Sequence, residues 1–248
     1  SLAHAGYLVV AFDFIGHGRH GKPLSPAIET LTGTTQDLVD QTLRVVRDAK
    51  RRTGLKYVSF VGHSMATDVV VRAAQGLKTT QSVVAISMYS DAVSPTHPER
   101  LLVVSGALES RLRAVALDKV SQVGLAQEGV TITSGNITRR AVSAPLVGHV
   151  GVLWSSLTLS EISAWLGTPG QPVSTGMRIA TLLVSILILF RTVVQVLPVT
   201  ALHNSISTRR AILAGTVAAV AAGGVAITGL PLIGFAGFGA LGLCLLYT

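Results

Sequence analysis

The sequence of 248 residues has a single cysteine, Cys244, which lies in an apolar run. One thiol excludes a disulfide framework within the chain and a metal cluster built on several thiolates. Aromatic residues are also scarce, at 5% of the chain, and the basic residues are scattered, as at Arg51-Arg52 and Arg139-Arg140. Surfaces that bind nucleic acids combine clustered basic side chains with aromatic ones. The sequence therefore argues against a nucleic-acid partner, although its formal net charge is +8.

Acidic residues are absent from the part of the chain that follows Glu161. All 12 aspartates and glutamates lie between Asp13 and Glu161, whereas arginine still occurs beyond this point, at Arg178, Arg191, Arg209 and Arg210. Arginines between apolar segments are typical of membrane proteins. The basic character of the chain thus has an explanation that needs no anionic partner.

Long apolar runs fill the C-terminal part of the sequence. A linker rich in Pro, Gly, Ser and Thr at 168–176 precedes a run of about the 20 apolar residues that a bilayer span needs, interrupted by Arg191 and Gln195. The apolar stretch from Ala211 to the end is too long for one span, and Gly229-Leu230-Pro231 divides it. We expect a transmembrane region at 177–248, with spans at about 177–199, 211–228 and 232–248.

Residues 1–167 show short β-branched apolar runs that alternate with amphipathic helical patterns. This alternation predicts an α/β domain with a mainly parallel, doubly wound sheet and helices on both faces. In such sheets, binding sites form at the carboxyl ends of the strands. The expected strands are 6–13, 56–62, 82–90, 100–106 and one within 129–144, and the expected helices are 37–52, 65–77, 110–124 and 157–167.

The segment "GHSMA", residues 62–66, nearly fits the nucleophile-elbow pattern G-x-S-x-G. A serine on a sharp turn between strand and helix has a strained backbone, so the residues two positions before and after it must be small. Gly62 and Ala66 occupy these positions, an apolar strand precedes them, and a helix follows. The start of that helix supplies positive potential and free N–H groups. The pattern predicts Ser64 as a nucleophile.

A serine hydroxyl needs a base to take its proton, and in this architecture the chain order is serine, acid, histidine. His97 and His149 follow Ser64 within the α/β domain. His149 lies after the last expected strand, in "PLVGHVGVL", where a base on a loop belongs. His97 precedes the best candidate acid, so we expect His149 to be the base.

Two acidic residues could orient the histidine. Glu109 lies just past the carboxyl end of the strand "RLLVVSG", and Asp91 follows the strand "VAISMYS". We expect Glu109 to be the acid and keep Asp91 as the alternative. A glutamate can orient and stabilise an imidazolium as an aspartate does.

Four segments of residues 1–167 together resemble the α/β-hydrolases, in particular bacterial membrane-linked esterases and dienelactone-hydrolase-like enzymes. They are "LAHAGYLVVAFDFIGHGRHGKPL", "VGHSMA", "LLVVSGALE" and "VGHVGVL". The resemblance implies Ser64 as nucleophile, His149 as base, Glu109 as acid and the Met65 backbone N–H as one oxyanion donor. It implies neither a cofactor nor a metal, and it makes Asp13 and His17 structural residues near the site.

The expected function is that of a membrane-anchored serine hydrolase that cleaves carboxylic esters through an acyl-enzyme. The alternatives are a non-catalytic α/β-hydrolase-like module on a multi-span membrane protein and a peptidase of the same fold. Only "DAVSPTHPE", residues 91–99, separates two of the expected strands, which leaves no room for a helical lid. We therefore expect an open site for small-molecule ester or acyl substrates.

The resemblance also places the second oxyanion donor on a loop that would precede residue 1, so we expect the sequence to be part of a longer protein. The lipid bilayer is the expected partner of the C-terminal spans, in a bacterial inner membrane. Arg209 and Arg210 favour a cytoplasmic loop between spans. The hydrolase domain would then face the extracytoplasmic side.

Overall fold

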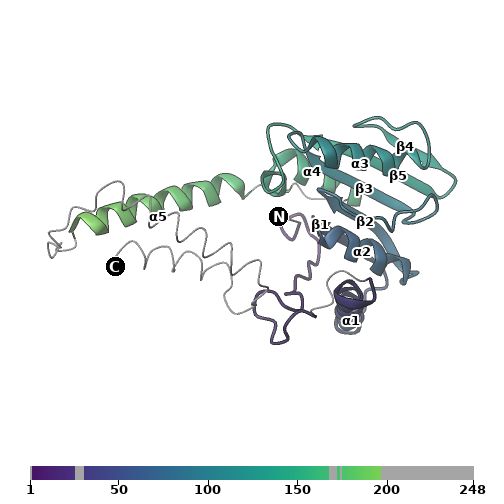
Figure 1. The fold of residues 1–248 in the computed structure, drawn as a ribbon, viewed down its shortest axis with the longest axis horizontal. Coiled ribbons are helices and arrows are strands. Elements are labelled where there is room, and N and C mark those ends of the chain that lie inside the picture. Colours follow the sequence, from purple (N-terminus) through teal and green to yellow (C-terminus); the bar gives the residue numbers. More distant parts are fainter. Residues whose placement is uncertain (1, 26–30, 168–171, 174, 197–248) are drawn as a thin grey trace. The chain divides into compact units, whose positions relative to one another are not determined.

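The computed structural model describes residues 2–25, 31–167, 172–173 and 175–196 (Figure 1). Its sheet has five strands in the order β1-β2-β3-β5-β4, in which β1, β2, β3 and β5 run parallel and β4 pairs antiparallel with β5. The predicted α/β fold with a mainly parallel sheet is confirmed. The strands are β1 (Val58–His63), β2 (Thr80–Ile86), β3 (Arg100–Gly106), β4 (Thr131–Ser134) and β5 (Ile137–Ala144).

Helices cover both faces of this sheet, because alternate residues of the central strands are buried on opposite sides. Val83 and Ala85 of β2 share a core with α1, α2 and α3, whereas Val84 and Ile86 pack in a second core with Trp165 of α4. The helices are α1 (Gln36–Thr53), α2 (Ala66–Gln75), α3 (Ser110–Ser121) and α4 (Ser156–Leu166), with short helical segments η1 (Leu31–Thr35) and η2 (Gly151–Trp154).

The prediction of a strand at 6–13 is wrong. Residues 7–14 form no strand, and Leu8, Val9 and Val10 are about half exposed or more. A β-strand needs a neighbour for its backbone N–H and C=O groups. Among the described residues β1 forms the edge of the sheet, and no strand pairs with residues 7–14. An apolar run of this kind is typical of a buried strand, but a strand also needs a neighbouring strand to pair with, and the run itself does not supply one.

The single strand expected within 129–144 is a hairpin. β4 and β5 are joined at Gly135, whose φ of 56° lies in the left-handed region that glycine adopts without strain. The antiparallel pairing of β4 makes the sheet mixed at this side.

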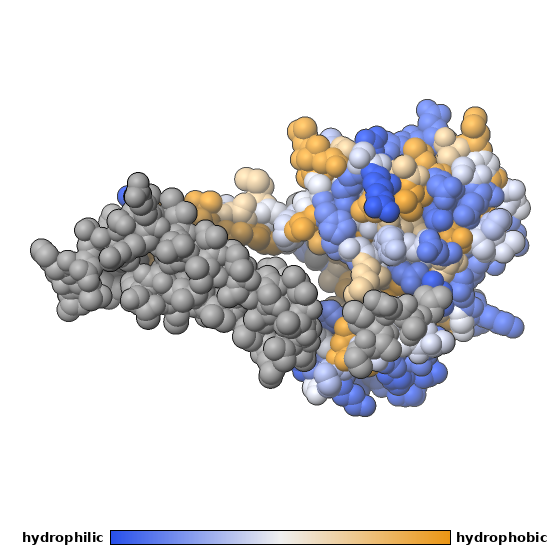
Figure 2. All heavy atoms as spheres, in the orientation of Figure 1, coloured by the Kyte–Doolittle hydropathy of each residue, from blue (hydrophilic) through white to orange (hydrophobic). Residues whose placement is uncertain are grey.

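The chain divides into two compact units, 1–186 and 187–248. Helix α5 (Gly176–Val196) begins where the first membrane span was expected, and Figure 2 shows its visible surface as mainly hydrophobic. Among the described helices, however, none is both long enough and apolar enough to cross a bilayer. The expected spans at 211–228 and 232–248 lie outside the described residues, as does the end of the first.

Candidate active site

Ser64 lies on a tight turn between β1 and α2, with a φ of 54° that is unusual for a residue with a side chain. Its N–H donates to the carbonyl of Ile86 at 2.9 Å, which ties the turn to the end of β2. A Cβ added at Gly62 would lie 2.8 Å from the Ala66 carbonyl oxygen and 2.9 Å from a methyl group of Val70. Only glycine therefore fits at position 62, because α2 turns back closely over the end of β1.

Three side chains from three separate loops meet at this turn. The Oγ of Ser64 lies 2.9 Å from Nε2 of His149, and Nδ1 of His149 lies 2.6 Å from Oε1 of Glu109. We call these three residues the triad. A carboxylate can only accept at Nδ1–H, so Nδ1 of a neutral His149 carries the hydrogen and Nε2 accepts from the Ser64 hydroxyl. This is the tautomer that a base for Ser64 requires.

Glu109 is held in place by donors on both sides of its carboxylate. Its Oε2 accepts from the Ser87 hydroxyl at 2.7 Å and from the Gly106 N–H at 2.6 Å, and its side chain is only 7% exposed. Burial raises the pKa of Glu109, but the hydrogen bonds from Gly106, Ser87 and His149 outweigh it and place the pKa below its usual value. Glu109 is therefore an ionised acceptor for His149 at neutral pH.

Sequence reasoning missed Ser87 and Gly106 as parts of the site. Ser87 has a φ of 50°, and its N–H donates to the Val104 carbonyl, which directs its hydroxyl across the carboxyl edge of the sheet. A Cβ at Gly106 would collide with the carbonyl oxygen of Val147, so the end of β3 touches the loop that carries His149. The available signals were a small polar residue directly after β2 and a glycine at the last position of β3.

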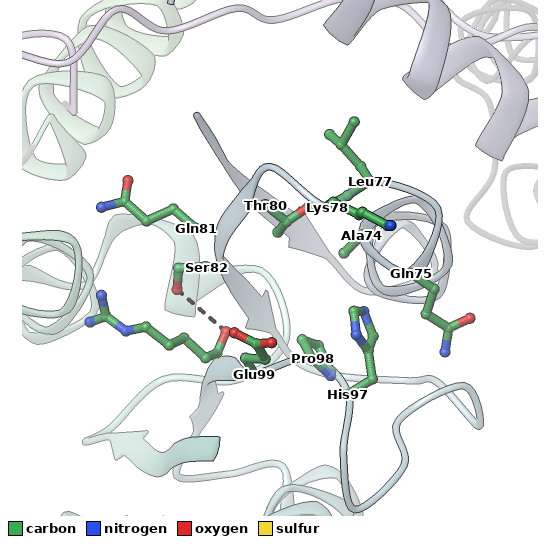
Figure 3. A pocket seen from close by; sticks show the side chains of 11 residues that line it. Ala74, Gln75, Leu77, Lys78, Thr80, Gln81, Ser82, His97, Pro98 and Glu99 are labelled. Carbon is green, nitrogen blue, oxygen red and sulfur yellow. Dashed lines mark hydrogen bonds between the residues drawn. The ribbon is translucent and has the colours of Figure 1, made fainter. Parts of the chain in front are cut away.

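The alternative acid and the alternative base lie apart from the triad. Asp91 is exposed, and the acidic partner of His149 within the described residues is Glu109. His97 instead lies beside a cavity of about 190 Å³ near the amino ends of β2 and β3, opposite the edge that carries Ser64. Figure 3 shows its ring directed toward α2, and its Nε2 is buried and without a partner among the described residues.

This cavity offers little to a ligand. Nε2 of His97 is almost completely buried, so it presents little surface to a molecule in the cavity. The side chain of Arg100 donates to the Trp165 carbonyl at 3.0 Å and lies over the Trp165 ring. The cavity is lined by Ala74, Gln75, Leu77, Lys78, Thr80, Gln81, Ser82, His97, Pro98, Glu99 and Arg100.

His63, the residue before Ser64, supports the loop of His149. Its Nε2 lies 2.8 Å from the backbone carbonyl oxygen of His149, and the two imidazole rings pack with their centroids 4.8 Å apart. A carbonyl only accepts, so His63 donates from Nε2. The turn that holds Ser64 is thereby joined directly to the loop that holds His149.

We expect His63→Phe to lower kcat on an ester substrate by about tenfold to a hundredfold, because a displacement of His149 by about 1 Å has effects of this size. Phenylalanine keeps the ring packing but removes the donor. His63→Gln, whose amide can donate to the same carbonyl, should recover part of the loss. Steady-state kinetics test this, with KM changing less than kcat; equal rates for the two variants would contradict the prediction.

The Met65 backbone N–H is free to act as the expected oxyanion donor. It follows Ser64 at the start of α2, and within the described residues it donates to no backbone carbonyl. The site is also open: residues 87–99, which join β2 to β3, contain no helix, and the side chain of His149 is 45% exposed. The segment between β2 and β3 thus agrees with the expectation that it is too short for a helical lid.

Asp13 and His17 belong to a loop that is fastened to α1. Gln41 accepts from the Ile15 N–H and donates to the Asp13 carbonyl, both at 2.9 Å, and Asp13 Oδ2 accepts from the Arg19 N–H at 2.9 Å. Nδ1 of His17 lies 3.0 Å from the Ile15 carbonyl oxygen. These bonds are internal to the loop and α1, and none of them reaches the triad.

The described part of the chain has no group of three His, Cys, Asp or Glu side chains that could hold a metal ion. The chain matches no protein-family model, and a search of curated proteins finds no significant relative. The function must therefore be argued from the geometry of the triad.

Proposed function

We propose that this protein is a serine hydrolase of the α/β-hydrolase type that cleaves carboxylic esters through an acyl-enzyme. The observation that carries the proposal is the continuous chain of hydrogen bonds from Ser64 Oγ through both ring nitrogens of His149 to Glu109. Each of the three side chains stands at the carboxyl end of a parallel strand, as the resemblance implies.

In the first half of the reaction, Nε2 of His149 takes the proton of the Ser64 hydroxyl while Oγ attacks the ester carbonyl. The Met65 N–H donates to the oxyanion that forms on the tetrahedral intermediate. His149 then gives its proton to the leaving alcohol, and the acyl group stays on Oγ. Glu109 remains ionised throughout and stabilises the imidazolium.

In the second half, a water molecule takes the place of the alcohol. His149 accepts a proton from this water as it attacks the acyl carbonyl, and returns the proton to Oγ when the C–Oγ bond breaks. The products are a carboxylic acid and the restored Ser64 hydroxyl. The exposure of His149 supports this step, since water reaches its ring directly.

Labelling with a fluorophosphonate probe tests the proposal, because this reagent phosphonylates only an activated serine. The full chain, kept soluble with a mild detergent, should be labelled, and Ser64→Ala should remove the label completely. Ser134→Ala is the matched control, since Ser134 is an exposed serine of β4 paired with Ile137 at the amino end of β5. Absence of label on the folded protein, or label that persists in Ser64→Ala, would overturn the proposal.

A further inference from the structure

Five large apolar side chains surround the triad and point into solvent. Large apolar residues at a surface are ordinary when single, but a group around one site indicates a binding surface. We call this group the apolar rim. It consists of Met65 (55% exposed), Tyr89 (64%), Leu108 (74%), Leu146 (90%) and Val150 (55%).

Four of the five rim residues are tied to a member of the triad by the chain or by hydrogen bonds, and the fifth, Leu146, lies three residues before His149 on the same loop. Met65 follows Ser64, Leu108 precedes Glu109 and Val150 follows His149. The N–H of Leu108 also donates to the Val147 carbonyl at 3.1 Å, so Leu108 lies against the loop of His149.

Tyr89 is linked to Ser64 through Thr67. The Thr67 hydroxyl lies 2.6 Å from the Ser64 carbonyl oxygen and 3.0 Å from the Tyr89 carbonyl oxygen, and it accepts from the Tyr89 N–H. The rim therefore draws residues from four different loops onto one edge of the sheet.

The backbone at this edge is strained. In the described part of the chain, three residues other than glycine have a positive φ: Ser64, Ser87 and Leu146. The first two hold the nucleophile and the acid. Leu146, with a φ of 58° and a side chain that is almost fully exposed, gains neither burial nor a relaxed backbone. Strained residues gather where function requires them, and an exposed leucine in this state fits a role in contact with a ligand.

Two of the charged groups near the rim are paired within the protein. Asp68 forms an ion pair with Arg72, and Arg113 forms one with Glu128. Asp91 is exposed near Tyr89 and would repel an anionic substrate. The apolar character of the binding surface therefore comes from the rim side chains, which favour an apolar group.

We propose that the apolar rim binds the acyl chain of the substrate, and that the enzyme prefers esters of medium-length aliphatic acids to acetate esters. This inference rests on the proposed function. Each methylene group that the rim removes from water should raise kcat/KM by roughly two- to fourfold. The rise in kcat/KM should end when the acyl chain is longer than the apolar rim can cover.

The test is a series of p-nitrophenyl esters from acetyl to decanoyl, each below its micelle concentration, with kcat/KM plotted against chain length. Leu146→Ser and Leu108→Ser should each flatten the rise, so that their losses grow with chain length. Leu125→Ser is the matched control, because Leu125 is 93% exposed and lies between α3 and β4, away from the triad. This variant should keep the slope of the unmodified enzyme.

A flat series from a protein that still takes the fluorophosphonate label at Ser64 would overturn the acyl-chain inference and leave the proposed function standing. A slope that stays unchanged in both rim variants would also overturn it. Circular dichroism of each variant separates loss of binding from loss of fold. If Ser64 does not take the fluorophosphonate label, the proposed function itself is overturned. This outcome is distinguishable from a flat chain-length series of a labelled protein, which overturns only the acyl-chain inference.

Discussion

His149→Ala should lower kcat for ester hydrolysis by about 10⁴- to 10⁶-fold, the range found when a triad member is removed from a serine hydrolase. The reason is specific to the geometry: Nε2 of His149 is the acceptor that stands 2.9 Å from the Ser64 hydroxyl. Initial rates with a p-nitrophenyl ester measure the effect. Because His149 also donates to the nearly buried Glu109, its removal should lower the free energy of unfolding, and a thermal unfolding curve checks that the variant is still folded under assay conditions.

Combining His149→Ala with Ser64→Ala provides the control for this prediction. Residues that act as one unit are strongly non-additive, so the double variant should be about as slow as either single one. If the fold-losses of the two single variants multiply in the double variant, the two side chains act independently. A loss of less than about tenfold in His149→Ala would contradict the mechanism.

The lowered pKa of Glu109 also determines how this site responds to acid. Its folded pKa lies below the unfolded value of about 4.3. Glu109 therefore contributes stability above about pH 4.3, and this contribution is lost as the pH falls through the folded pKa.

Arg139→Met should lower the free energy of unfolding by about 3–5 kcal/mol. Arg139 of β5 has no exposed surface, and among the described residues no carboxylate pairs with it. Its guanidinium donates instead to the carbonyls of Lys119 at 2.6 Å and His97 at 3.3 Å, to the Ser94 carbonyl and to the Gln122 side chain. Methionine fills a similar volume but removes all of these hydrogen bonds, and among the described residues the carbonyls of Ser94 and His97 keep only the backbone hydrogen bonds that they make with each other.

Guanidinium titration followed by tryptophan fluorescence measures this change in the full chain. Arg111→Met, at an exposed position of α3, is the matched control and should stay within about 0.5 kcal/mol of the unmodified protein. The two variants remove the same charge, so the difference between them isolates the buried hydrogen bonds. A loss of less than about 1 kcal/mol in Arg139→Met would contradict the interpretation that the hydrogen bonds of Arg139 stabilise the packing of α3 against the loop before β3.

Local patterns in the sequence were sufficient for most of the secondary structure. The apolar runs of β1, β2 and β3 and the helical spacing of α1 to α4 predict their own conformation, because periodicity and turn residues act over a few neighbours. The same holds for the turn at Ser64, where Gly62 and Ala66 supply the space that the tight approach of α2 requires.

Long-range pairing, by contrast, was decided only by the tertiary structure. The run at 6–13 has the composition of a buried strand, yet no strand of the described sheet pairs with it. The hairpin of β4 and β5 was expected as one strand, since the turn at Gly135 is short and the flanking residues are polar. Pairing depends on which backbone lies alongside, and that information is not local.

The sequence by itself determined which residue types stand at the ends of the strands, and hence that Ser64, His149 and an acid could meet at one edge of the sheet. It left Glu109 and Asp91 both open as the acid. Only the tertiary structure decided that Glu109 faces His149, because Ser87 and the Gly106 N–H fix its carboxylate from a neighbouring strand and its own loop. Ångström-scale distances between loops far apart in the chain arise from packing of the whole sheet, which no short stretch of sequence encodes.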